Sequence, residues 1–136
     1  FKKERRKRVA KCAVRLNLNM TYDLEERTAK FGEDIIKFCR LIETDIIIHP
    51  LITQLIRSAT SVGANYMEAN QASSKKDFKN KIRICQKEAN ETKHWLRMMA
   101  NASPDRKQEC RKLWEESHEL TLIFAKISKS SNELKN

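Results

Sequence analysis

Apolar side chains recur along this chain at alternating spacings of three and four residues, in four separate stretches. This spacing places them on one side of an α-helix, which folding then buries against other helices. The pattern predicts helices over residues 24–43, 50–72, 75–100 and 104–130. The expected core positions are Leu24, Thr28, Phe31, Ile35, Phe38 and Ile42 in the first helix, Ile52, Leu55, Ala59, Val62, Tyr66 and Ala69 in the second, Phe78, Ile82, Cys85, Ala89, Thr92, Leu96 and Met99 in the third, and Cys110, Leu113, Ser117, Leu120, Phe124, Ile127, Ser131 and Leu134 in the fourth.

The segments between these helices are short and carry helix-start signals. Pro50 suits the first turn of a helix because its missing N–H would have no partner there. Ser74 and Ser103 are expected N-caps, and residues 46–48 are expected to cap one end of the core. Connections this short force neighbouring helices to run antiparallel. The fold class is therefore all-α, an antiparallel up-down-up-down four-helix bundle.

Composition agrees with long helices. The 136 residues include only two Gly and two Pro, fewer than the turns of a β-rich chain require. No apolar run approaches the ~18 residues of a membrane span, and no signal-peptide pattern is present. The four cysteines (Cys12, Cys39, Cys85 and Cys110) form no CxxC pair, so we expect reduced thiols and a cytoplasmic protein.

The net charge of +10 is concentrated at one end of the chain. Residues 1–15 contain eight basic residues and one acidic residue, whereas the rest contains twenty basic and seventeen acidic residues. Residues 1–19 are therefore treated as a basic N-terminal extension, either disordered or helical, ahead of a bundle domain over 20–136. Arg5, Arg6 and Arg8 could bind nucleic acid, and a tail without a role is an equal alternative.

The second and third helices each carry an additional stripe beside the core positions. Small and polar residues form the stripe of the second helix, which is either a partly exposed face or a polar contact with a neighbouring helix or subunit. Apolar side chains in the stripe of the third helix predict packing against another subunit. The predicted oligomer interface consists of Ile84, Trp95 and Met98.

The second helix also contains the pattern Arg57-Ser58-x-x-Ser61-Val62-x-x-Asn65-x-x-Glu68, which lies between Tyr22-Asp-Leu-Glu-Glu-Arg27 and Ser74-Lys-Lys-Asp-Phe78. Over about residues 21–130 the chain resembles the small bacterial four-helix-bundle proteins encoded in intervening sequences of 23S rRNA genes. The resemblance implies a left-handed bundle that assembles as a ring, with a pentamer favoured. It also implies similarity to the accessory protein of diversity-generating retroelements, which binds nucleic acid and works with a reverse transcriptase.

The resemblance implies mainly structural roles for the residues that match the family pattern. Arg57, Ser61, Asn65 and Glu68 match the family pattern, and we expect a buried polar network that fixes helix register or a subunit contact. Direct ligand binding by these residues is the alternative. The family brings no established enzymatic activity for its intervening-sequence members.

Candidate catalytic chemistry is weak. Two Glu-x-x-His motifs, Glu91–His94 and Glu115–His118, are typical of di-iron bundles, but their registers do not converge on a core site. Of these four residues, only Glu91 falls on the additional stripe of the third helix. No Gly-rich phosphate loop and no nucleophile–histidine pair on a common inward face are present. We expect no metal, no cofactor and no enzymatic activity.

The third helix carries a basic side over about six turns. Such a row could follow the phosphates of RNA or DNA without reading bases, and a solvated basic face is the alternative. The first hypothesis is an oligomeric nucleic-acid-binding or RNA-associated protein. The second is a structural scaffold that recruits a protein partner such as a reverse transcriptase. The candidate phosphate-binding residues are Lys76, Lys79, Arg83, Lys87, Lys93 and Arg97.

Overall fold

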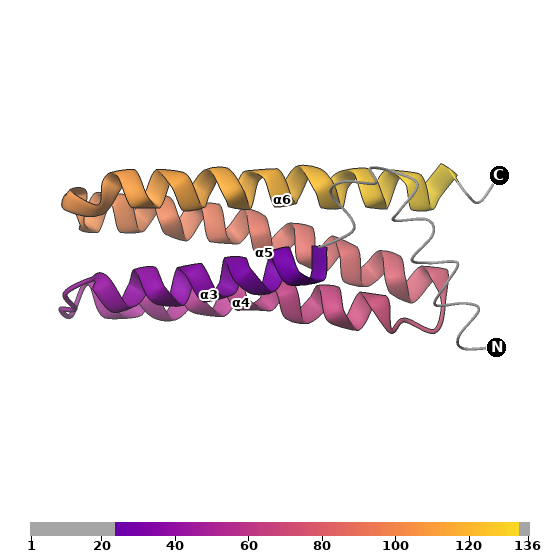
Figure 1. The fold of residues 1–136 in the computed structure, drawn as a ribbon, viewed down its shortest axis with the longest axis horizontal. Helices are drawn as coiled ribbons and strands as arrows, with labels where there is room; N and C mark the ends of the chain where they lie inside the picture. The colour runs from indigo at the N-terminus through magenta and orange to yellow at the C-terminus, as the bar shows by residue number, and fades with distance from the viewer. Residues whose placement is uncertain (1–23, 134–136) are drawn as a thin grey trace.

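The computed structural model of the protein describes residues 24–133, with side chains described to residue 131. Four long helices lie alongside one another, and each runs opposite to the helix before it (Figure 1). The predicted all-α four-helix bundle is confirmed. Residues 1–19, including Arg5, Arg6 and Arg8, lie outside the described residues. The elements in chain order are α3 (Leu24–Leu41), α4 (Ile48–Asn70), α5 (Lys75–Ala102), the short 3₁₀ helix η1 (Pro104–Arg106) and α6 (Lys107–Glu133).

Each helix packs mainly against its neighbours in sequence, and α6 returns to contact α3. The contact between α3 and α6 includes a bridge from Arg27, whose guanidinium lies 2.7 Å from Glu116 and 2.8 Å from Glu119. The helices α3 and α5 therefore lie at opposite corners of the bundle. This arrangement separates the outer surface of α5 from that of α3.

The alternating spacing identified the core correctly. Almost all expected core positions within the described side chains are buried, while Ile52, Leu113 and Ser131 are partly exposed. Polar members of the core are satisfied by hydrogen bonds. Ser117 Oγ donates to the carbonyl of Ala89 at 2.7 Å, and Thr92 Oγ1 donates to the carbonyl of Glu88 at 2.8 Å.

The helix ends differ in detail from the sequence prediction. Ser74 caps α5 as expected, because its Oγ accepts from the N–H of Asp77 at 3.1 Å. However, α4 begins at Ile48 rather than Pro50, since Asp45 Oδ1 accepts from the N–H groups of Ile47 and Ile48 at 2.9 and 2.8 Å. The carboxylate thus starts the helix two residues early. The first helix ends at Leu41, the third extends to Ala102, and η1 precedes the last.

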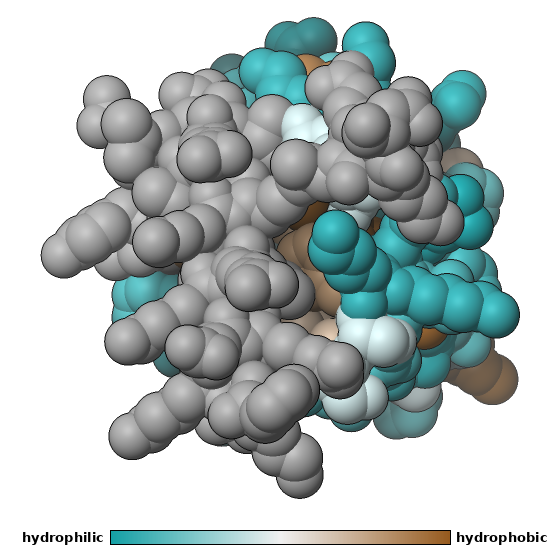
Figure 2. All heavy atoms as spheres, turned by 90° about the vertical axis from the view of Figure 1, so that its right-hand side faces the viewer, coloured by the Kyte–Doolittle hydropathy of each residue, from teal (hydrophilic) through white to brown (hydrophobic). Residues whose placement is uncertain are grey.

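The prediction that residues 46–48 cap the core is wrong for two of the three. Ile48 is buried, but Ile46 and Ile47 are 90% and 67% exposed. The turn before α4 directs these two side chains away from the helices. They belong to the connection between α3 and α4, at the left-hand end of the bundle in Figure 1. Figure 2 shows the opposite end, and the described surface of that opposite end is mostly hydrophilic.

The three described cysteines behave as core residues. Cys39, Cys85 and Cys110 are buried and form no disulfide. Burial raises the pKa of the Cys39 and Cys110 thiols to about 11 and that of Cys85 to about 12. These thiols are therefore protonated at neutral pH and poorly nucleophilic.

Two glycines lie in the contact between α3 and α4, but only at Gly63 is there too little room for a larger residue. A Cβ added at Gly63 would lie 3.3 Å from the carbonyl carbon and oxygen of Thr28, which are backbone atoms that cannot move alone. A Cβ at Gly32 would meet Thr60 Cγ2 at 3.5 Å, an ordinary contact. The backbones of α3 and α4 thus leave less room at Gly63 than at Gly32.

This difference gives a paired stability prediction. Gly32→Ala should raise the free energy of unfolding by about 0.5–1 kcal/mol, because alanine loses less backbone entropy in a helix. Gly63→Ala should give no gain or a loss, because the crowding of Thr28 opposes the same advantage. Urea unfolding of both variants measures the difference. An equal gain at both positions would contradict the close approach of the backbones at Gly63.

Candidate functional site

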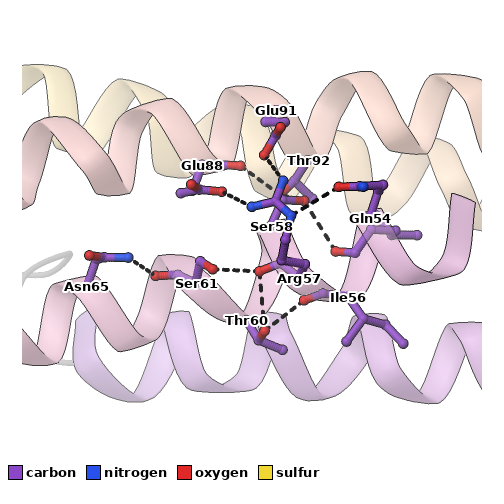
Figure 3. A network of polar contacts seen from close by, with 11 residues as sticks. Gln54, Ile56, Arg57, Ser58, Thr60, Ser61, Asn65, Glu88, Glu91 and Thr92 are labelled. Carbon is purple, nitrogen blue, oxygen red and sulfur yellow. Dashed lines mark hydrogen bonds and ion pairs between the residues drawn. The ribbon is translucent and has the colours of Figure 1, made fainter. Parts of the chain in front are cut away.

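Where α5 packs beside α4, cations and carboxylates pair across the two helices. Arg57 Nη1 lies 3.3 Å from Glu88 Oε2, and Arg57 Nη2 also pairs with Glu91 (Figure 3). Further along, Lys81 Nζ lies 2.6 Å from Glu68 Oε2. We call these five residues the paired edge. Its positive and negative charges largely cancel.

The ionisation of the paired edge reflects its geometry. Burial raises the pKa of Glu88, and the neighbouring charge of Glu91 adds to this effect. The hydrogen bond from Arg57 lowers the pKa of Glu91 and raises that of Arg57. Lys87 is exposed, and its charge lowers the pKa of both carboxyl groups, although it forms no ion pair with a described side chain.

The side of α5 turned away from α4 is different. Lys76, Arg83 and Arg97 are separated by multiples of seven residues, so they share one line along the helix. All three are exposed, and none has a carboxylate of residues 24–131 within ion-pair distance. We call these three residues the unpaired edge. Lys79, which is half-buried, lies on the same side of α5.

The unpaired edge ends at an open cavity between the end of α5 and the beginning of α6. The cavity has a volume of about 660 Å³, and its lining includes Arg97, Lys107, Arg111 and Trp114. Of these four residues, only Arg97 was predicted from the sequence to bind phosphate. Lys107, Arg111 and Trp114 are four and three residues apart, which places them on a common side of α6. This spacing was the signal in the sequence that could have identified them as one group.

Trp114 is held by two neighbours. Its ring stacks on His118, with ring centres 5.1 Å apart and an interplanar angle of 15°. Lys93 Nζ lies 5.2 Å from the centre of the Trp114 ring and 3.1 Å from His118 Nδ1. Lys93, a predicted phosphate-binding residue, thus contacts an aromatic ring and a histidine rather than a carboxylate.

The predicted oligomer interface lies on the same side of α5 as the paired edge. Ile84 is 36% exposed, whereas Trp95 and Met98 are partly buried. Trp95 packs against the core of its own chain, and its buried Nε1 has no hydrogen-bond partner in the described part of the chain. Other exposed apolar side chains gather near the connection between α3 and α4, at Leu41, Ile46 and Ile47.

The described residues offer neither a metal site nor a membrane span. No three His, Cys, Asp or Glu side chains lie close enough together there to hold a metal ion. His118 of the second Glu-x-x-His motif is instead engaged with Trp114 and Lys93. Within the same residues, no helix combines the length and apolar character needed to cross a bilayer.

Comparison with known proteins decides the family. The family model described as 23S rRNA-intervening sequence protein matches residues 21–126. The chain belongs to this family. A crystal structure of a protein of unknown function from the S23 ribosomal protein family of Bacteroides thetaiotaomicron is similar, with 29% identity and a TM-score of 0.69. The match covers 77% of this chain and 97% of that one. No curated protein matches the chain.

In this intervening-sequence protein, the family-pattern positions lie along α4 and do not form one buried cluster within the single chain. Ser61 Oγ donates to the carbonyl of Arg57 at 2.6 Å, and Asn65 Nδ2 donates to the carbonyl of Ser61 at 2.8 Å, so both bonds stay within α4 (Figure 3). The Arg57 side chain is 44% exposed, and that of Glu68 57%.

The buried polar contact between α4 and α5 comes instead from a pair that sequence reasoning did not connect. Thr92 Oγ1 lies 2.9 Å from Ser58 Oγ, and both side chains are fully buried. The sequence predicts Thr92 as a core position of its helix, whereas Ser58 stands out as part of the family pattern. Only the packing of α4 on α5 brings the two hydroxyl groups together.

Proposed function

We propose that this protein is a non-enzymatic, oligomeric nucleic-acid-binding protein that acts through a basic surface. The observation that supports the proposal is the contrast between the two edges of α5. Cations of the paired edge are neutralised by Glu68, Glu88 and Glu91. Those of the unpaired edge have no carboxylate partner among the described side chains, residues 24–131.

Unpaired, exposed cations in a row suit a phosphate backbone. Lys76 and Arg83 are seven residues apart in α5, a rise of roughly 10 Å. Phosphate contacts of this kind give affinity through release of counterions and carry no sequence information. Assembly of several copies, with a pentamer favoured from the family, would repeat the row and increase avidity.

A salt series tests the proposal. The full chain is titrated with a mixed-sequence RNA duplex and the matching DNA duplex, and binding is measured by fluorescence anisotropy. We expect log affinity to fall linearly with log salt, by about 0.9 for each phosphate contacted. Oligomer mass is measured alongside by light scattering. Absence of binding at low salt, or affinity that does not respond to salt, would refute the proposal.

A variant of the full chain tests whether the N-terminal extension, rather than the bundle, binds the nucleic acid. Replacing Arg5, Arg6 and Arg8 together by alanine removes tail charge and leaves the bundle intact. If the bundle is the binding surface, this variant should retain most of the affinity and most of the salt dependence. Loss of all binding in this variant would assign nucleic-acid binding to the extension.

A second candidate is a scaffold that recruits a protein partner such as a reverse transcriptase. It is favoured by the exposed apolar side chains of Leu41, Ile46 and Ile47 at one end of the bundle. Exposed apolar groups of this kind are typical of protein contacts. Partner binding that survives charge reversal on the unpaired edge would favour this candidate over the first.

A further inference from the structure

The cavity at the end of the unpaired edge has an apolar floor. Leu96 and Cys110 line it and are almost completely buried, so the floor is part of the bundle core. Ala100 completes this apolar lining from α5. The lining residues come from the ends of α5 and α6 that η1 joins, and Figure 1 shows this connection at one end of the bundle. A surface that continues a packed core keeps its shape when a ligand binds.

One wall of the cavity is an aromatic ring that is already fixed in position. Trp114 is 37% exposed, and it contacts His118, one turn later in α6, and Lys93 of α5. Lys107 and Arg111 line the cavity from one to two turns before Trp114, and Glu115 lines it directly after the ring. The ring thus packs on His118 and Lys93 and also borders the cavity. A fixed ring loses little entropy when another ring stacks on it.

The rim of the cavity is cationic. Arg97, Lys107 and Arg111 line it, against one carboxylate, Glu115. None of the three cations is in an ion pair or a hydrogen bond with another side chain of residues 24–133. An apolar floor, an aromatic wall and a positive rim match a base together with its flanking phosphates. A duplex cannot present that combination, because its bases are paired and stacked inside.

We propose that this cavity binds an unpaired base of single-stranded RNA or DNA, stacked on Trp114, with the flanking phosphates on Arg97, Lys107 and Arg111. This inference deepens the proposed function and rests on it, since the unpaired edge brings the strand to the cavity. The volume of about 660 Å³ lies within the range of pockets that hold small ligands, so a nucleotide fits. The protein then prefers strand ends, loops and bulges over uninterrupted duplex.

Affinity measurements on the full chain test the stacking contact. The probes are a fluorescein-labelled oligouridylate of about 12 nucleotides and an RNA duplex of the same length. Trp114→Ala should weaken oligouridylate binding by roughly five- to 150-fold, the range for loss of one stacked base, and should leave duplex binding unchanged. The salt dependence for oligouridylate should not change, because no phosphate contact is removed.

Two further variants control for folding and for loss of apolar surface. Trp114→Phe keeps a ring and should restore most of the affinity. Leu122→Ala removes an exposed apolar side chain, 50% accessible, from the same helix and should have no effect. Circular dichroism of each variant checks that helix content is retained.

A spectroscopic measurement reports on the ring directly. The chain has two tryptophans, so Trp95→Phe leaves Trp114 as the single tryptophan, whose emission is excited selectively over that of the tyrosines. Oligouridylate should quench its emission, whereas the duplex should not. This substitution also removes the Nε1 donor that has no partner in the described part of the chain.

Three results would overturn the inference. Equal loss of duplex and oligouridylate affinity in Trp114→Ala would mean that the ring supports the surface without stacking on a base. A changed oligomer mass with unchanged oligouridylate affinity would mean that another subunit occupies the cavity. Salt-dependent duplex binding with no effect of Trp114→Ala on oligouridylate would refute the stacking site and leave the proposed function standing. If neither probe binds, both proposals fail.

Discussion

Phe124→Ala should lower the free energy of unfolding by about 3–5 kcal/mol, the usual cost of removing a buried phenyl ring. Phe124 is fully buried in α6, and its ring centre lies 6.1 Å from that of Tyr66 on α4. The substitution removes that ring contact and leaves a cavity in the bundle core. Urea unfolding monitored by circular dichroism measures the loss, which is a large part of the stability of a small domain.

Leu122→Ala is the matched control for this stability effect. Leu122 lies on the same helix, two residues away, and is 50% exposed. Its truncation should change the free energy of unfolding by no more than about 0.5 kcal/mol. A loss below about 1 kcal/mol in Phe124→Ala would contradict the central position of this ring. A large loss in Leu122→Ala would instead indicate that a second subunit covers that face.

The bundle was predictable because the spacing of core positions depends on local helix geometry alone. Even polar residues such as Thr92 and Ser117 were placed correctly in the core by their position in the repeat. Helix ends were less predictable, because they depend on single hydrogen bonds. The carboxylate of Asp45 starts α4 and turns Ile46 outward, and neither effect can be read from hydrophobicity.

The candidate site was predictable only in part, because it depends on which residues face each other across two helices. The basic residues of α5 could be recognised as a row along one helix. Their division into two edges could not, since it depends on Glu68 and Arg57 of α4 lying beside Lys81 and the carboxylates of α5. The cavity beside Trp114 requires residues from two helices on either side of a turn, so no spacing within one helix reveals it.

The division of α5 into two edges changes how its charge should be interpreted. Counting Lys and Arg along the whole helix would treat Lys81 and Arg83 alike, yet only Lys81 has a carboxylate partner, at 2.6 Å. A paired cation must break that contact before it can bind a phosphate, whereas an unpaired one only exchanges counterions. The unpaired edge is therefore the part of α5 best suited to a polyanion.

Charge reversal on this edge should have the largest effect on binding. The double variant Lys76→Glu, Arg83→Glu should weaken duplex RNA binding by at least tenfold at about 0.1 M salt, because two attractive contacts become repulsive. The slope of log affinity against log salt should fall in magnitude by about 1.8 when two duplex contacts are lost. Anisotropy titrations across a salt series measure both quantities.

The control must separate the effect of where the charges lie from the effect of changing the net charge of the protein. Lys30 and Lys37 of α3 are also exposed, also seven residues apart, and have no ion-pair partner among residues 24–133. The variant Lys30→Glu, Lys37→Glu therefore makes the same change in charge at the opposite corner of the bundle. Its affinity should fall much less, because charges more than a Debye length (about 10 Å at 0.1 M salt) from the phosphates are screened. Equal losses in both variants would mean that binding responds to total charge, and the unpaired edge would then have no special role.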